Sequence, residues 1–523
     1  MSEQATADTG GSTVRRRSLR RIPAPNTTAC VISGLSLFLL GLAVVLPQYG
    51  RLDDYSQLLD VQSAGFRSFV SNSLTFGRPV TFAVNGALYR IADSVDGFWL
   101  LRLIAVSTFA AGAVTVGLLS RRGSQSYWAS ITFGALIFAL PGTWVFITWA
   151  QGAGHGTSFL LAAAAAYAAS RAYEHRGTRS LILWLLAFTL TLLAMFGYQP
   201  LGLAIPGIAI ACALVSRRID VTRIGLVMLI VAGSAFVINA AMVKALASGA
   251  LSERTGFTTD WSAKATWLSG EFLPRVLWPF SLTASLLAAG IVAVAALAIF
   301  AVAGYSTIGS RSFRTWLLGV VVASAAVLAP MLPFFVIGEN WASSRAVLAP
   351  AFTFWLLLIA LLSRFVVDRN SGDLAREATS DRDSLRAGAR IAFPTLMTVA
   401  AIAGMATAWS GLAQPSSQEW AQAKTIWSGA PTTVRSATVL RQSFVGNGIP
   451  QLSYDEYGVL TGSTITGAQS LQTLAAREGR GIPILYASVS VSEKPGTCDS
   501  GELFAFSNQE TRMLINPTRP WKC

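Results

Sequence analysis

The sequence predicts an all-α polytopic membrane protein of about eleven transmembrane helices, followed by a small C-terminal α/β domain. Of its 523 residues, 53% are hydrophobic and only 13% are charged, whereas a soluble protein carries about 25% charged residues. Uncharged stretches of spanning length recur along most of the chain. Arginines gather in the short segments between these stretches, as they do in cytoplasmic loops.

The net charge of +14 raises the question of nucleic-acid binding. Its distribution argues against that class of function, because the basic residues follow the topogenic pattern of a membrane protein. Residues 1–27 are polar and rich in arginine, and we expect a disordered cytoplasmic tail. The apolar run that follows is long enough to span and has no small-residue cleavage site, so we expect a retained first helix.

Eleven spans place the N-terminus in the cytoplasm and the C-terminus outside the plasma membrane, and the arginine bias agrees at every inside loop. The predicted spans are 29–47, 97–119, 127–149, 157–173, 181–197, 201–215, 224–246, 281–304, 315–336, 346–363 and 391–410.

These spans divide the chain into a transmembrane domain over 28–410 and an extracytoplasmic domain over 411–523. The transmembrane domain has two long outside loops, 50–96 and 247–280. The first loop has the mixed polar and apolar character of amphipathic helices at a membrane interface.

The C-terminal domain combines helical and strand patterns. Residues 416–427 and 468–479 predict helices, and three apolar segments predict short strands: 482–492, 502–508 and 511–516. Cys498 and Cys523 lie in this polar region and can form a disulfide if it is outside the cytoplasm.

Two adjacent carboxylates follow the first span, in the run "YGRLDDYSQLLD". Asp53 and Asp54 could cap an interfacial helix, since Asp is a good N-cap. Alternatively, one of them is a general base that deprotonates an acceptor hydroxyl, and its neighbour raises its proton affinity or holds the acceptor. We favour Asp53 as the base.

An arginine in a tight turn follows in the same loop, in the run "LTFGRPVTFAVNGALYRI". Arg78 lies between Gly77 and Pro79, ahead of an apolar helix. It could simply extend its charge to the interface, or its guanidinium could bind a phosphate.

These motifs resemble those of a known family. An acidic pair in the first outside loop is typical of GT-C membrane glycosyltransferases. More closely, "DDYSQL", "FGRPVTFAVNGALY" and "FGYQP", in this order, look like the bacterial glucosyltransferases that modify O-antigen. The resemblance is local, strongest over 50–90 and moderate at 196–200. It implies a polyprenyl-phosphate-linked sugar donor, an active site on the outside face and inversion at the anomeric carbon.

Other residues at the outside ends of spans could complete such a site. Arg345, at the start of a span, is a candidate phosphate ligand or a topological anchor, and Glu339 could pair with it. Tyr198 and Gln199 could contact a sugar or phosphate, or bond to a neighbouring helix.

The second outside loop also carries candidate substrate ligands. Arg254 and Arg275 alternate there with tryptophans, which stack on sugars but also form membrane belts. His155, in "QGAGHG", is better explained as a loop residue than as a catalyst.

Together these features predict an enzyme that transfers one sugar from a polyprenyl-phosphate donor to a cell-envelope glycan or glycolipid. Arg78 and Arg345 would neutralise the leaving phosphate. No metal is required, although a divalent ion is compatible with the pair of carboxylates. The alternative is a transporter or flippase of lipid-linked glycans, which explains the acidic pair and the C-terminal domain less well.

Overall fold

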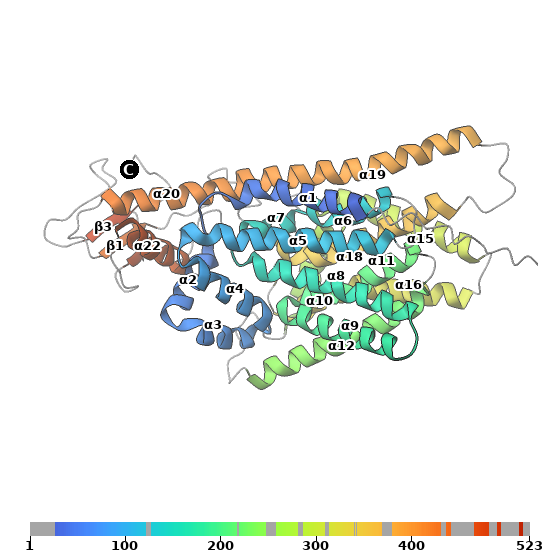
Figure 1. Cartoon of the computed structure of the whole chain (residues 1–523), viewed down its shortest axis with the longest axis horizontal. Helices are drawn as coiled ribbons and strands as arrows, with labels where there is room; N and C mark the ends of the chain where they lie inside the picture. The colour runs from blue at the N-terminus through green and yellow to red at the C-terminus, as the bar shows by residue number, and fades with distance from the viewer. Residues whose placement is uncertain are drawn as a thin grey trace, which may run out of the picture.

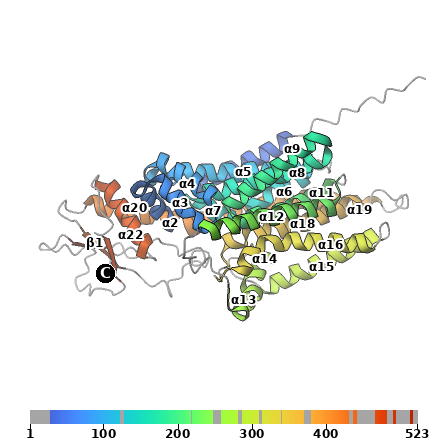
Figure 2. The ribbon, with the colours of Figure 1, turned by 90° about the horizontal axis from the view of Figure 1, so that it is seen from below.

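The computed structural model describes residues 27–121, 127–216, 219–246, 258–280, 286–308, 313–338, 340, 342–368, 379–429, 436–440, 465–480, 489–492 and 512–515. The chain is mostly helical, and most of its long helices lie side by side along one axis (Figures 1 and 2). Each of the eleven predicted spans overlaps a helix of the structure.

Among the described residues, six helical segments are long and apolar enough to cross a membrane: Val95–Ser120, Gly177–Gly197, Val221–Leu246, Trp316–Val336, Ser344–Ser363 and Ile391–Gly429. A seventh span is possible where Ser130–Ala139 and Pro141–Thr148 meet at an angle of 61°. Three more apolar helices are shorter: Ala29–Val45, Gln199–Val215 and Leu286–Leu297. The chain is therefore a membrane protein, and the count of eleven spans stays a prediction.

Two long loops, between α1 and α5 and between α12 and α15, interrupt the helices of the predicted transmembrane domain. Their bounds are α1 Thr27–Val45, α5 Phe98–Arg121, α6 Tyr127–Ala139, α7 Pro141–Thr148, α8 Gly152–Glu174, α9 Gly177–Gly197, α10 Gln199–Leu203, α11 Ile205–Ser216, α12 Val221–Leu246, α15 Leu286–Ile308, α16 Phe313–Leu328, η4 Ala329–Met331, α17 Leu332–Val336, α18 Ser344–Asp368, α19 Thr379–Ala408 and η6 Trp409–Ala413.

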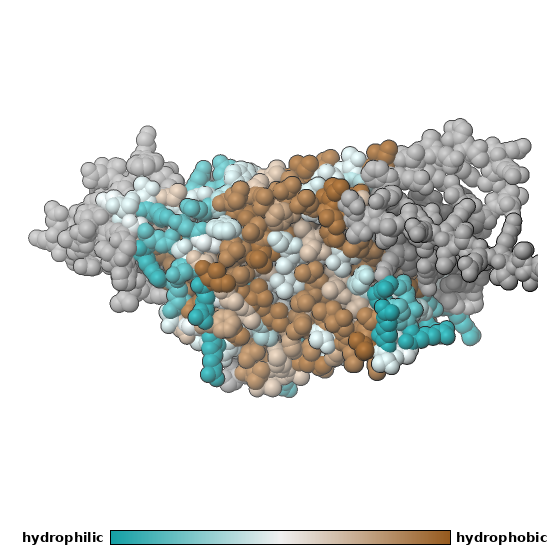
Figure 3. All heavy atoms as spheres, in the orientation of Figure 1, coloured by the Kyte–Doolittle hydropathy of each residue, from teal (hydrophilic) through white to brown (hydrophobic). Residues whose placement is uncertain are grey.

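An apolar belt covers the middle of the visible face, and hydrophilic residues lie on both sides of it (Figure 3). Large apolar side chains on the outer helices stay exposed in this belt, for example Leu185 on α9, Ile230 on α12 and Val321 on α16. A soluble protein would bury such side chains, whereas a lipid tail solvates them.

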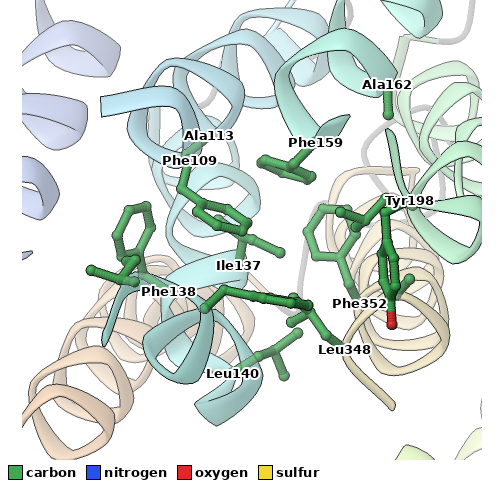
Figure 4. Close-up of a cluster of buried hydrophobic side chains, with 14 of the residues drawn as sticks. Phe109, Ala113, Ile137, Phe138, Leu140, Phe159, Ala162, Tyr198, Leu348 and Phe352 are labelled. Atoms are coloured by element: carbon green, nitrogen blue, oxygen red, sulfur yellow. The ribbon is translucent and has the colours of Figure 1, made fainter. Parts of the chain in front are cut away.

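Aromatic rings fill the interior between the helices. Phe109, Phe146, Phe159 and Phe352 stack or meet edge to face with centroid separations of 5.4–6.3 Å. Figure 4 shows several of these rings in one cluster with Tyr198. Through this cluster, α5, α7, α8 and α18 pack against one another.

The first predicted outside loop forms a compact group of short helices, as the sequence predicted. The elements are α2 Leu52–Ser63, α3 Gly65–Ser73, η1 Leu74–Phe76, α4 Pro79–Ala92 and η2 Val95–Gly97. Within the second loop, the described elements are α13 Trp261–Trp267, the π-helix η3 Leu268–Phe272 and α14 Leu273–Leu277.

The helix that contains the last predicted span does not end at residue 410. It continues through η6 into α20, Gln414–Gly429, so the first predicted helix of the C-terminal region extends the last span. Hydropathy marks where a helix leaves lipid, and the backbone hydrogen bonds continue beyond that point.

The described remainder of the C-terminal region is a parallel β–α–β arrangement. The elements are β1 Ser436–Leu440, α22 Ile465–Arg480, β2 Val489–Ser492 and β3 Arg512–Ile515. Strand order is β2-β1-β3, with Ala437 opposite Val489 and Met513. The predicted helices and two of the predicted strands are present here, while β1 was not predicted. Cys498 and Cys523, the predicted disulfide, and the strand predicted at 502–508 lie outside the described residues.

These C-terminal helices pack beside α2 at one end of the molecule (Figures 1 and 2). Tyr55 of α2 stacks on Trp420 of α20 with centroids 5.8 Å apart. Arg477 of α22 donates to Gln62 Oε1 of α2 at 2.6 Å. The helix that carries the acidic pair is thus held partly by the C-terminal region.

Candidate active site

Asp54 joins three separate elements through its carboxylate. Oδ2 accepts hydrogen bonds from the main-chain N–H groups of Arg51 at 2.9 Å and Ala150 at 3.0 Å. Oδ1 accepts from the N–H of Gln151 and from the hydroxyl of Tyr89, both at 3.1 Å. Asp54 therefore closes the first turn of α2 and ties it to α4 and to the turn that precedes α8.

This carboxylate is completely buried. Burial raises the pKa of Asp54, while hydrogen bonds from the three main-chain N–H groups act in the opposite direction. Its two oxygens already accept from four donors, which is about the full capacity of a carboxylate. These contacts favour the helix-cap interpretation of the pair for Asp54.

Asp53 occupies a different environment, although it is the adjacent residue. It is half-buried, and the Nε2 atom of Gln151 lies 3.4 Å from its Oδ2. Its Oδ1 has no hydrogen-bond partner in the described part of the chain. Of the pair, Asp53 is thus the carboxylate that has an oxygen left to accept a proton.

Arg102 fixes the connection between α1 and the acidic pair. It is fully buried on α5, and its guanidinium donates to the carbonyl oxygens of Val45, Pro47 and Tyr49. Its charge also lies 3.9 Å from the centroid of the Tyr49 ring. Val45 is the last residue of α1 and the other two follow it, so Arg102 holds the chain in place four to eight residues before Asp53.

Arg345 lies beside the turn formed by Trp149, Ala150 and Gln151. It is at the start of α18, and its guanidinium carbon is 3.9 Å from the centroid of the Trp149 ring. The guanidinium of Arg51 lies 5.4 Å from the same ring. Because Ala150 and Gln151 follow directly, one short turn joins Arg345 to both carboxylates.

Arg78 is held by Tyr198 and Gln199. Its guanidinium carbon is 5.0 Å from the centroid of the Tyr198 ring, and its Nε donates to Gln199 Oε1 at 3.4 Å. The Gln199 amide also donates to the carbonyl of Gly77 at 3.2 Å, and Asn239 of α12 donates to the same oxygen at 2.8 Å.

Gly77 itself is needed for this turn. It has a φ of +66°, and an added Cβ would lie 2.9 Å from both the Gln199 Nε2 and the Asn239 Oδ1 atoms. Glycine is the residue that adopts this backbone conformation without strain. The "FGRP" motif is therefore a turn that presents Arg78 to the neighbouring helices.

His155 connects the two groups of residues. Its Nδ1 atom is 3.2 Å from the carbonyl oxygen of Gln151, and its ring centroid is 5.0 Å from that of Tyr198. The charges of Arg78 and Arg345 both act on this imidazole. His155, predicted to be an ordinary loop residue, is instead buried at the centre of the site.

We call Asp53, Asp54, Tyr89 and Gln151 the acidic end of the site, and Arg78, Arg345, Trp149, Tyr198 and Gln199 the basic end. The structure thus brings Asp53, Asp54, Arg78, Arg345, Tyr198 and Gln199 into one continuous set of contacts. Of the other predicted residues, Arg275 lies on α14, which packs against α15 and α18. Arg254 and Glu339 fall outside the described residues.

Several residues of this site were not singled out from the sequence. Trp149 was the last residue of a predicted span, and Gln151 was passed over in the short loop after it. Asn85, whose amide donates to the carbonyl of Gln151 at 3.0 Å, was passed over in the predicted first loop. Arg102 had a clear signal, because a charge inside a predicted span usually has a specific partner.

A divalent cation would find few carboxylate ligands in the site. Ca²⁺ takes six to eight oxygen ligands, and Mg²⁺ takes six in a near-octahedral arrangement. Asp54 already accepts four hydrogen bonds, so Asp53 is the carboxylate that could ligate an ion. Within the described ranges, no three His, Cys, Asp or Glu side chains converge as a metal site would require.

No known protein family matches the sequence, and no curated protein matches it either. Among solved structures, the chain is similar to ArnT from Cupriavidus metallidurans, bound to undecaprenyl phosphate and in the apo state. Both have 12% identity and a TM-score of 0.41, over 83% of this chain and 85% of that one. The Archaeoglobus fulgidus oligosaccharyltransferase, in complex with Zn and sulfate, has 13% identity and a TM-score of 0.35, over 83% of this chain and 62% of that one. These similarities are too low to assign the chain to a family, so its function has to follow from its own residues.

Proposed function

We propose that the chain is an inverting GT-C membrane glycosyltransferase, related to the bacterial enzymes that modify O-antigen. It transfers a single sugar from a polyprenyl-phosphate donor to a cell-envelope glycan or glycolipid outside the plasma membrane. The supporting observation is that one half-buried carboxylate, Asp53, shares a site with Arg78 and Arg345. This is the combination that a base-assisted displacement of a phosphate requires.

In the proposed reaction, Asp53 accepts the proton of the acceptor hydroxyl as that oxygen attacks the anomeric carbon. The bond between this carbon and the phosphate oxygen breaks at the same time, so the configuration inverts. The phosphate gains negative charge as it leaves. Arg78 and Arg345 stabilise this charge, and they do so strongly because the site is partly shielded from water.

The proposal assigns the remaining parts of the chain as follows. Eleven spans place the acidic pair, the second loop and the C-terminal region on the outside face, with the N-terminus in the cytoplasm. Arg254, Arg275 and Glu339 are proposed substrate contacts, and Cys498 pairs with Cys523. No step of the proposed reaction requires a metal, although a divalent ion at Asp53 is compatible with it.

The experiment that tests this proposal compares the cell-envelope glycans of cells with and without the protein by mass spectrometry. We expect the loss of one sugar increment from a glycan or glycolipid, restored by the wild-type gene and not by Asp53→Asn. Asp60→Asn is the matched control, because it makes the same chemical change on the exposed side of α2.

A flippase gives a different result in this experiment. Deleting a flippase would remove or truncate a whole glycan, and Asp53→Asn would then restore it as well as the wild type does. Once the sugar is known, its polyprenyl-phosphate form can be given to the purified protein to measure transfer directly.

A further inference from the structure

The side chain of Gln151 has an unusual position in the site. Its main-chain N–H binds Asp54, and its carbonyl accepts from the Nδ2 atom of Asn85 at 3.0 Å. These contacts hold the backbone of the turn without help from the side chain. The side-chain amide meets only two groups in the described part of the chain: Asp53 through its Nε2, and Gln57 through its Oε1.

Gln57 determines which way this amide faces. It lies four residues after Asp53, so both project from one face of α2. Its Nε2 donates to Gln151 Oε1 at 2.9 Å, which leaves the Gln151 N–H groups facing Asp53. The other end of the Gln57 amide, Oε1, is buried and has no hydrogen-bond partner within the described residues.

We propose that Gln57 and Gln151 form an amide relay that positions Asp53 and follows its protonation state. This inference rests on the proposed function, in which Asp53 is the general base. While Asp53 is ionised, Gln151 donates to Oδ2 and leaves Oδ1 directed at the acceptor hydroxyl. The contact of 3.4 Å is long, as catalytic hydrogen bonds often are before substrate binds.

The relay can reverse when the proton is transferred. As the acceptor O–H bond breaks, Oδ1 of Asp53 gains the proton, and a protonated carboxyl is a donor. Rotation of this carboxyl about its Cβ–Cγ bond brings the protonated oxygen to Gln151. Both amides then rotate, so that Gln151 accepts from Asp53 through Oε1 and donates to Gln57 Oε1. Because the far end of the Gln57 amide accepts no hydrogen bond within the described residues, it does not fix the amide in its present orientation, and the protonation state of Asp53 can decide the orientation of the pair.

The informative variant is Gln57→Glu. An ionised glutamate can only accept, so it forces Gln151 to donate to it and to turn its oxygen toward Asp53. That orientation opposes the ionised base. We expect kcat to fall by about ten- to a hundredfold, the range of a lost charge-assisted hydrogen bond. The KM for the donor should stay unchanged, because the relay lies away from Arg78 and Arg345.

Two further variants separate this role from simple packing. Gln57→Leu removes the orienting group without reversing the relay, so we expect a smaller loss of kcat than in Gln57→Glu. A purely structural role predicts the opposite order, because leucine leaves Gln151 Oε1 without a donor, whereas glutamate can still pair with Gln151. Gln62→Glu is the charge control, since it adds the same charge to α2 at a partly exposed position, nine residues from Asp53, where Arg477 already donates to the side-chain oxygen.

The assay uses purified full-length protein. Thermal shift measures the binding of polyprenyl phosphate, and transfer rates are measured with the donor that the glycan experiment identifies. The inference is overturned if Gln57→Glu keeps the wild-type kcat, or if Gln62→Glu loses as much. It is also overturned if Gln57→Leu is the more damaging of the two Gln57 variants. Full activity of Asp53→Asn would instead remove the proposed function, so the two failures are distinguishable.

Discussion

Hydrogen bonds to main-chain N–H groups hold the acidic end of the site, whereas the faces of aromatic rings hold the basic end. Asp54 accepts from Arg51, Ala150 and Gln151, so its position is fixed in distance and direction. Arg78 and Arg345 lie over the rings of Tyr198 and Trp149, a contact that tolerates sliding and rotation. Asp54 thus fixes the helix that carries Asp53, while the cations can adapt, which suits the proposed reaction, in which a lipid phosphate arrives and leaves.

This contrast also separates the two carboxylates, which the sequence presents as equivalent. The hydrogen bonds of Asp54 hold the acidic end together, and in the proposed reaction Asp53 accepts the proton. The difference comes from a turn 96 residues further along the chain, which supplies the N–H of Ala150 to Asp54. If the comparison is right, substitutions at the two ends fail in different ways.

The largest effect should come from Asp53→Asn. The amide keeps the size of the side chain but cannot take the acceptor proton, and general base catalysis contributes about 10²–10⁴-fold. We expect transfer to fall by that factor, with thermal stability and binding of polyprenyl phosphate unchanged. Initial rates with purified protein measure this, with Asp60→Asn as the control on the same helix. Wild-type rates in Asp53→Asn would show that the acidic end is only a helix cap.

The basic end should respond more weakly and in a different parameter. In Arg78→Ala and Arg345→Ala we expect a loss of about ten- to a hundredfold in kcat/KM, because a charge-assisted hydrogen bond contributes about 1.5–3 kcal/mol. Thermal-shift titration with polyprenyl phosphate should show weaker binding in both. Arg171→Ala, which breaks a half-exposed ion pair with Glu174 on α8, is the control. Unchanged phosphate binding would remove both arginines from the site.

Asp54→Asn should act mainly through stability. The amide turns one acceptor oxygen into a donor that faces either main-chain N–H groups or the Tyr89 hydroxyl, inside a buried site. Leaving such a group unsatisfied costs about 1–3 kcal/mol, so we expect a lower melting temperature and about a tenfold loss of transfer. Tyr89→Phe removes one of the four donors and is the milder companion variant. Asp54→Asn with normal stability and more than a hundredfold loss of transfer would make Asp54 the base.

Local patterns in the sequence were enough to predict the helices and the main polar residues of the site. Asp53, Asp54, Arg78 and Gln199 all stand in short runs whose polarity is unusual for their surroundings. The different surroundings of Asp53 and Asp54 could not be predicted, because they depend on contacts with Ala150 and Gln151, far away in the chain. No pattern in the sequence announces such a pairing.

Helix ends and short strands were harder to predict for physical reasons. The polar residues after 410 indicate where the chain leaves lipid, yet a helix can continue in water, as α20 does. β1 is five residues long, Ser436–Leu440, and so short a segment shows no clear alternation. Its pairing with β2 and β3, which lie more than 45 residues further on, is what makes it a strand.

The smallest effect concerns the C-terminal helices that pack against the acidic end. Glu478 of α22 accepts from the N–H of Val95 at 2.7 Å, and Lys424 of α20 lies 3.1 Å from Asp96. Burial raises the pKa of Glu478 from 4.5 to about 7, with a further contribution from Asp96, while the Val95 N–H, Lys424 and Arg477 lower it. The folded protein therefore holds this proton more tightly than the unfolded chain does.

This pKa shift stabilises the packed helices at low pH. The stabilisation is complete below about 4.5 and is lost as the pH rises through about 7. We expect the melting temperature of the wild type to fall by a few degrees between pH 5 and 8 through this group, and Glu478→Gln to lack that component because its amide does not titrate. Asp96→Asn should move the transition to lower pH, since it removes the nearby negative charge. Thermal unfolding across this pH range measures all three proteins. The same slope in the wild type and in Glu478→Gln would mean that another group near the acidic end controls how firmly α20 and α22 hold α2.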